Sequence, residues 1–152
     1  MFRVNIRLLL RCPCLTAVIS GSEEYPEICG KVSFFNVCGG SLVSAEIFNL
    51  PPTKSIFAMH IHNGGSCTGN ENDPFADSGS HLNLTGEEHP FHTGDLPALF
   101  SNGGYAWTAF YTDRFCTSQI KGCTVIIHAQ PDDYHTQPSG NSGKKIACGI
   151  IK

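Results

Sequence analysis

The sequence predicts an all-β protein, and three observations carry this expectation. Apolar and β-branched residues fall in short runs, several of which alternate with polar residues as half-buried strands do. Clusters of Gly, Pro, Asn and Asp separate these runs, and the chain contains 16 glycines and 9 prolines. No segment shows a convincing helical period of about 3.6 residues. A β-sandwich or β-barrel of about eight strands is therefore expected.

Residues that favour turns end each of the first predicted strands. Ser and Gly at 20–22 follow the first strand, Gly39-Gly40 follows the second and Pro51-Pro52 follows the third. Such residues end strands because Gly adopts positive φ angles readily and Pro has no amide hydrogen to donate. Strands are expected at residues 15–19, 31–37, 41–48, 55–62, 96–100, 105–111, 123–128 and 145–151.

Two long segments interrupt this pattern. Residues 64–94 show neither strand nor helix periodicity, and residues 129–143 are rich in Pro, Asp, Ser and Gly. A structureless segment as long as the first is uncommon in a compact domain unless it has a function. Because it contains several side chains that can bind metals, we expect it to carry a functional site.

The chain of 152 residues is long enough for one domain with its own core. We expect residues 1–13 to form an N-terminal extension and residues 14–152 to form the domain. The extension lacks the apolar stretch of about 7–15 residues that marks a signal peptide, and no membrane span is expected. The lack of a signal peptide favours a cytoplasmic location for the protein, and the compartment stays open. The net charge of -3 and the lack of a basic stripe argue against nucleic-acid binding.

Five of the seven histidines lie between His60 and Asp95, and a sixth, His128, ends a later predicted strand. Neutral imidazole is a common ligand of transition metals, so the sequence predicts a metal site, and specifically one for two metals. His60 and His62 are two residues apart on a predicted strand, which directs both side chains to the same face. An isolated pair of this kind is equally typical of a solvent-exposed face, so the pair indicates a metal site only together with the other histidines.

A second group of potential ligands follows in the long loop. Three imidazoles and a carboxylate suit the tetrahedral coordination of zinc. The group consists of His81, His89, His92 and Asp95. A zinc hydrolase would also need a general base, for which Glu87 and Glu88 are the only nearby glutamates, and the HExxH motif is absent. That class is therefore disfavoured.

Four motifs resemble those of the copper–zinc superoxide dismutase family, in the same order along the chain. They are GSHLN at 79–83, HTGDL at 92–96, VIIH at 125–128 and GNSGKKIACG at 140–149. The similarity extends from Ala17 to Ile151. It implies a Greek-key β-barrel of about eight antiparallel strands, sandwich-like, with two long loops that carry the metal site.

The resemblance also implies a role for each ligand position. The implied copper ligands are His60, His62, His81 and His128, and the implied zinc ligands are His81, His89, His92 and Asp95. His81 would bridge the two metals as an imidazolate, which loses both protons only beside two cations. Asp132 would hydrogen-bond one ligand histidine at each metal and so fix the orientation of both rings.

By the same resemblance, Cys67 and Cys148 form a disulfide that ties the ligand loop to the last strand. It would enclose roughly 80 residues and stabilise the fold by about 4 kcal/mol in the loop-entropy model. Whether it forms depends on the redox state of the compartment. Pairings of Cys29 with Cys38 or Cys116 with Cys123 stay open. The cysteines to which the resemblance gives no role are Cys12, Cys14, Cys29, Cys38, Cys116 and Cys123.

The chain departs from the family at Lys145. The family places an arginine beside the copper, three residues before the second cysteine of the disulfide. Lysine keeps the positive charge but lacks the planar fork that grips an anion at two points. We therefore expect weaker orientation of superoxide with electrostatic steering partly retained. Lys144 is the other candidate for this role.

The function implied by the resemblance is disproportionation of two superoxide anions to oxygen and hydrogen peroxide. His81 would take up a proton when it is released from copper and would pass that proton to peroxide, while Lys145 attracts the anion. The alternative is a dismutase-like copper- or zinc-binding protein with low or no activity, because Lys145 replaces the arginine. Members of the family are often dimers, so a homodimer is among the expected states.

Overall fold

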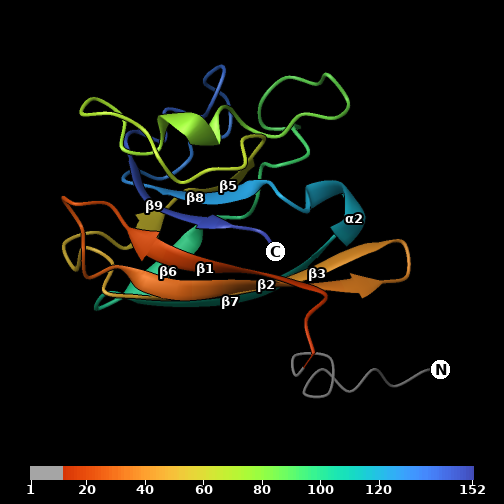
Figure 1. Ribbon diagram of the computed structural model, residues 1–152, viewed down its shortest axis with the longest axis horizontal. Coiled ribbons are helices and arrows are strands. Elements are labelled where there is room, and N and C mark those ends of the chain that lie inside the picture. The colour runs from red at the N-terminus through yellow and green to blue at the C-terminus, as the bar shows by residue number, and fades with distance from the viewer. Residues whose placement is uncertain (1–11) are drawn as a thin grey trace.

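The computed structural model describes residues 12–152, and the predicted N-terminal extension lies almost entirely outside them (Figure 1). Within this range nine strands form one antiparallel sheet in the order β4-β6-β7-β3-β2-β1-β9-β8-β5. The strands are β1 (Leu15–Gly21), β2 (Cys29–Val37), β3 (Gly40–Phe48), β4 (Ile56–Phe57), β5 (Met59–His62), β6 (Leu99–Asn102), β7 (Tyr105–Thr112), β8 (Thr124–His128) and β9 (Lys145–Ile150). The all-β prediction is confirmed.

The sheet curls into a nearly closed barrel. In Figure 1, β1, β2, β3 and β7 form one layer, and β5, β8 and β9 lie above it with the long loops on their far side. The strands β4 and β5 lie at the two opposite edges of the sheet although only Ala58 separates them in the chain. This short connection links both edges and so nearly closes the barrel.

The structure corrects the predicted strand 55–62, which is two strands and not one. Ile56 and Phe57 pair with β6, whereas Met59–His62 pairs with β8 on the other side of the barrel. Ala58 lies at the change of partner, where its N–H donates to Gln130 O at 2.9 Å. The alternation of apolar residues continues through such a change, so periodicity alone does not reveal it.

Two further expectations are corrected. The segment 96–98 precedes β6, because Pro97 has no N–H for a ladder and the strand begins only at Leu99. The described residues also contain two short helical turns, the 3-10 helix η1 (Ala76–Ser78) and the helix α2 (Thr117–Ile120). Neither is long enough to produce a helical period in the sequence. Neither has the length or apolar character needed to cross a membrane.

The core lies between the two layers and positions β5, whose other face bears His60 and His62. Apolar side chains from both layers fill it, among them Val32, Phe34, Val43, Met59 and Ile61. Every residue of β5 and β8 is buried. A strand with one face toward the core can be buried on both faces only if another element covers the second face. Here the two long loops cover it.

Candidate metal centre

Strand β5 presents two histidines on the face opposite to the core. Met59 and Ile61 belong to the core cluster, so the alternation of side chains along a strand turns His60 and His62 to the other face. The two histidines are only 0% and 2% exposed. They are therefore held inside the protein beneath the loops, and not on a solvent-exposed face.

Two segments of the loop 63–98 run beside β5 and pair with its backbone. Ile61 O accepts a hydrogen bond from Leu82 N at 2.8 Å, and Ile61 N donates to Gly94 O at 2.9 Å. Glycine is needed at position 94 because a Cβ there would lie 2.2 Å from the Ile61 carbonyl oxygen. The segment predicted as structureless is thus anchored to the sheet. The bridged pairs are His60 with Asp95 and His62 with His81.

His128 reaches the same place from the end of β8. Its backbone N–H donates to Ala58 O at 3.0 Å, which fixes it beside the start of β5. A register shift between Ile127 and His128 in the pairing with β9 alters the direction of the strand there. The His128 ring centroid lies 5.0 Å from that of His60 and 5.5 Å from that of His62.

The predicted ligands gather into two groups. In each group one potential ligand atom per residue can be chosen so that all lie within 4.8 Å of one another, and every residue is buried. The four-histidine set consists of His60, His62, His81 and His128. The mixed set consists of His81, His89, His92 and Asp95.

His81 belongs to both sets and presents a different ring nitrogen to each. Its Nδ1 lies 2.7 Å from Asp95 Oδ1, within the mixed set. Its Nε2 is buried and has no hydrogen-bond partner in residues 12–152. The ring lies close to the strand histidines, with its centroid 4.0 Å from that of His60 and 5.0 Å from that of His62. One imidazole therefore lies between the two sets.

The four-histidine set leaves one ring nitrogen of each histidine without a partner. His62 and His128 donate from Nδ1 to backbone carbonyl oxygens at 2.9 and 3.2 Å, and His60 donates from Nε2 to a carboxylate at 2.7 Å. Because these hydrogen bonds fix the tautomers, the opposite nitrogens carry lone pairs. Those atoms are buried and form no hydrogen bond within the described chain. The same is true of His81 Nε2. Buried polar atoms that converge without partners are costly unless a cation binds them.

The mixed set is organised around Asp95. Its Oδ2 lies 3.0 Å from His89 Nδ1 and 3.3 Å from His92 Nδ1. Neither of these nitrogens forms a hydrogen bond within residues 12–152, although both are buried. Burial raises the pKa of Asp95, but the hydrogen bond from His81 and the neighbouring imidazoles outweigh it and hold the pKa below its usual range. Asp95 is therefore an anionic oxygen donor beside three imidazoles.

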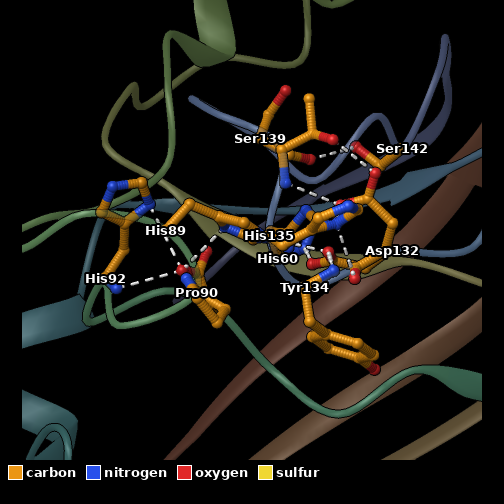
Figure 2. Close-up of polar contacts among 12 residues, drawn as sticks. His60, His89, Pro90, His92, Asp132, Tyr134, His135, Ser139 and Ser142 are labelled. Atoms are coloured by element: carbon orange, nitrogen blue, oxygen red, sulfur yellow. Dashed lines mark hydrogen bonds and ion pairs between the residues drawn. The ribbon is translucent and has the colours of Figure 1, made fainter.

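Asp132, from the second long loop, connects the two sets (Figure 2). Its Oδ2 accepts a hydrogen bond from His60 Nε2 at 2.7 Å, and its Oδ1 accepts one from His89 Nε2 at 2.9 Å. Burial raises the pKa of Asp132, but hydrogen bonds from His60, Tyr134 N and His89 outweigh it and keep the carboxylate ionised. One carboxylate thus orients one imidazole of each set.

Burial keeps the strand histidines neutral. It lowers the pKa of His62 to about 2, with the charges of His128 and His81 adding to the effect. It lowers the pKa of His128 to about 3, with His60 the next cause. Neutral imidazole is the form that binds metals, so the lone pairs of these residues are available throughout the physiological pH range.

A cavity of about 630 Å³ opens onto the four-histidine set. His62, His81 and His128 lie in its wall together with Lys144 and Lys145. The Lys144 side chain is 77% exposed and its Nζ lies 4.0 Å from Glu24 Oε2. The Lys145 side chain is only 14% exposed and its Nζ lies 2.8 Å from Asp73 Oδ2. The lysine predicted to meet the anion is therefore already paired.

The disulfide between Cys67 and Cys148 is present and spans 81 residues of sequence. It joins the ligand loop to β9, as the resemblance implies. The open pairings of Cys29 with Cys38 and of Cys116 with Cys123 are not found. The free cysteines among the described residues are Cys12, Cys14, Cys29, Cys38, Cys116 and Cys123.

Sequence reasoning missed two residues that support the site. The first is Asp73, the partner of Lys145. The second is Arg114, whose Nη1 donates to the carbonyl oxygens of Pro90, His92 and Asp95 at 2.9, 3.1 and 3.2 Å. Arg114 thus fixes the backbone that carries the mixed set. Neither residue stands in a motif, and no spacing relates Arg114 to a loop 19–24 residues earlier in the chain.

Comparisons with known sequences point to one family. Residues 28–151 match the family model described as copper/zinc superoxide dismutase. The chain is 33% identical over 143 residues to the superoxide dismutase [Cu-Zn] of Legionella pneumophila, a match that covers 91% of this chain and 86% of the relative. It is 34% identical over 145 residues to that of Escherichia coli K12, covering 86% and 83%.

Solved structures share the fold. The Cu/Zn superoxide dismutase from Brucella abortus matches with a TM-score of 0.78 at 24% identity, over 90% of this chain and 98% of that one. A double mutant of a dismutase-like protein from Bacillus subtilis matches with a TM-score of 0.75 at 30% identity, over 88% and 94%. The first of these likenesses is evidence for the fold alone. The family model and the relatives in sequence show that the chain belongs to the copper/zinc superoxide dismutase family.

Proposed function

We propose that this protein is a superoxide dismutase that binds copper in the four-histidine set and zinc in the mixed set. The observation that carries the proposal is that both sets are complete and share His81. Family membership supports the same activity, because relatives about a third identical to this chain are named superoxide dismutase [Cu-Zn]. The reaction consumes two superoxide anions and two protons and yields oxygen and hydrogen peroxide.

The donor chemistry supports this division of metals. Four imidazoles with open access from a cavity suit copper, whose binding sites are typically rich in histidine. Three imidazoles and one carboxylate, all buried, suit a closed tetrahedral zinc site. When bound, copper supplies the one-electron redox chemistry and zinc supplies a fixed positive charge.

The role of His81 follows from its two nitrogens. Nδ1 faces the mixed set, where it donates to Asp95 in this structure and where it would bind zinc in the loaded protein, so the ring keeps its orientation when Nε2 is free. Nε2 points toward the set that borders the cavity, where it can take up a proton and donate it to reduced superoxide. Asp132 and the backbone carbonyl partners hold the remaining rings in place during this exchange. His81 Nε2 thus gains and loses one proton while the other rings stay in place.

Lys144 and Lys145 add positive charge at the cavity, which attracts small anions. Lys145 stands where the family has arginine and is ion-paired with Asp73. This observation favours the second candidate function, a dismutase-like metal-binding protein with low activity. One protein of the same fold, from Bacillus subtilis, is described as dismutase-like.

The test is reconstitution with one equivalent of copper and one of zinc, followed by measurement of superoxide decay. We expect catalysis well above that of metal-free protein and of zinc-only protein, and its loss in a His128→Ala variant. Fully loaded protein without activity above buffer would refute the dismutase function and leave the metal-binding alternative. A Lys145→Arg variant with greatly increased turnover would show a competent copper site with poor anion guidance.

A further inference from the structure

The ammonium group of Lys145 is occupied by the disulfide-bonded loop. Its Nζ lies 2.8 Å from Asp73 Oδ2, 3.0 Å from Phe75 O and 3.5 Å from Gly79 O. A lysine ammonium has three hydrogens to donate, and these three oxygens take them up. An anion that enters the cavity therefore meets a cation whose hydrogen bonds are already made.

Asp73 is itself held in a fixed position. Its Oδ1 accepts a hydrogen bond from Phe75 N at 3.0 Å, which leaves Oδ2 directed at Lys145. Asp73 also lies in the wall of the cavity that contains Lys145 and the histidines. Opposite unit charges at this separation largely cancel at the distance of an approaching anion. The local charge that the anion meets at this point of the wall is close to zero.

Lys145 nevertheless lies where a free charge would act on a copper-bound anion. Gly79 O accepts hydrogen bonds from both Lys145 Nζ and His62 Nδ1, at 3.5 and 2.9 Å. Lys145 is also the strand partner of His128. By contrast, the neighbouring Lys144 is exposed and its contact with Glu24 is a weak surface pair at 4.0 Å. The partner of Lys145, and not the lysine alone, thus decides the field at the site.

We propose that Asp73 is a specificity-determining residue that neutralises Lys145 and so limits the affinity of the cavity for small anions. The inference rests on the proposed function, because the anions concerned are those that bind at the copper. Removal of the Asp73 carboxylate leaves a buried ammonium without its counter-charge. The cavity then gains about one positive charge and binds superoxide and similar anions more tightly.

The test is a titration of copper- and zinc-loaded protein with azide, followed in the Cu(II) absorption spectrum. Asp73→Asn keeps the shape of the side chain, and we expect it to lower the azide dissociation constant about three- to tenfold. Asp73→Glu keeps the charge and should remain within about twofold of the wild type, as should Glu24→Gln at the exposed Lys144 pair. In the Lys145→Met background, Asp73→Asn still removes a negative charge but frees no ammonium hydrogen for the anion, so its gain should be clearly smaller.

Two results of this titration would overturn the proposal: unchanged azide affinity in Asp73→Asn, or an equal gain with and without Lys145.

A second readout needs no metal. In metal-free protein, acetylation by acetic anhydride should modify Lys145 more slowly than Lys144, and Asp73→Asn should raise the Lys145 rate several-fold. Equal rates at both lysines in the wild type would show that Asp73 does not hold Lys145. A failure of the proposed function would appear separately, as absent dismutation with azide binding and acetylation behaving as stated.

Discussion

The two ligand sets differ in how the chain supports them. Three members of the four-histidine set stand on the paired strands β5 and β8, and only His81 comes from a loop. Every member of the mixed set lies in the loop segment 81–95. The sheet therefore positions most of the four-histidine set, whereas contacts between loops position the mixed set.

This difference indicates which contacts matter for each ligand set. The backbone of β5 and β8 is fixed by many hydrogen bonds, and Asp132 orients only the ring of His60 on this fixed backbone. The loop positions depend on a few contacts, chiefly those of Arg114, Asp132 and the backbone pairing with β5. We expect changes at Arg114 and in the loop backbone to affect zinc affinity much more than copper affinity, whereas a change at Asp132 should affect both.

The largest effect is expected at His81, the one residue that belongs to both sets. His81→Ala removes a ligand from both sets, so copper and zinc affinity should each fall by more than about 100-fold and dismutation should fall to background. The matched control is His92→Ala, which should weaken zinc by a similar factor but copper far less. Competition with chelators of known affinity measures both metals. Retention of zinc affinity in His81→Ala would show that the sets are separate.

The next effect concerns the disulfide that joins the ligand loop to strand β9. Cys67→Ala opens the disulfide and should lower the free energy of unfolding by about 4 kcal/mol, because it releases a long loop in the unfolded chain. Denaturant unfolding of metal-free protein measures this value. Cys116→Ser changes an exposed free cysteine and should have little effect. An equal loss in both variants would contradict the assignment.

Acid should lower the free energy of unfolding of the metal-free protein because of its buried strand histidines. The pKa of His62 falls from 6.5 to about 2 and that of His128 to about 3 on folding. Between these values and 6.5 the unfolded chain binds more protons, so stability falls as the pH falls below 6.5. Each histidine should contribute about 1.4 kcal/mol per pH unit. Denaturant unfolding from pH 7.5 to 5 should show a shallower slope in His128→Gln, and an unchanged slope would contradict this.

A smaller and more selective effect is expected at Arg114. Arg114→Met removes three hydrogen bonds to the backbone that carries the mixed set, so zinc affinity should fall about tenfold. Copper affinity should change by less than about twofold, because Arg114 makes no contact with the strand histidines. Lys121→Met, an exposed cation elsewhere, is the control. Equal losses of both metals would show that the two sets are not supported independently.

Much of the fold and of the site could be predicted from the sequence, for identifiable reasons. Alternation located most strands, since each has one face toward the core. The spacing of His60 and His62 predicted their common face, and the motifs around His81 and His128 implied the ligand sets. These features are local, so residues near in sequence determine them.

The remaining features depend on residues distant in sequence. The division of 55–62 at Ala58 follows from closure of the barrel, which no local pattern records. The contacts of Arg114 with the backbone of the mixed set and of Asp73 with Lys145 arise only when loops fold back on the sheet. A lysine in place of an arginine indicated a changed charge at position 145, but only the structure reveals its partner.

We propose that one imidazole, that of His81, lies between two different metals. Anomalous diffraction from crystals of copper- and zinc-loaded protein, measured at both absorption edges, tests it most directly. We predict one copper peak on the Nε2 side of His81, among His60, His62 and His128, and one zinc peak on the Nδ1 side, beside Asp95. A single metal peak, or two peaks without His81 between them, would contradict the account.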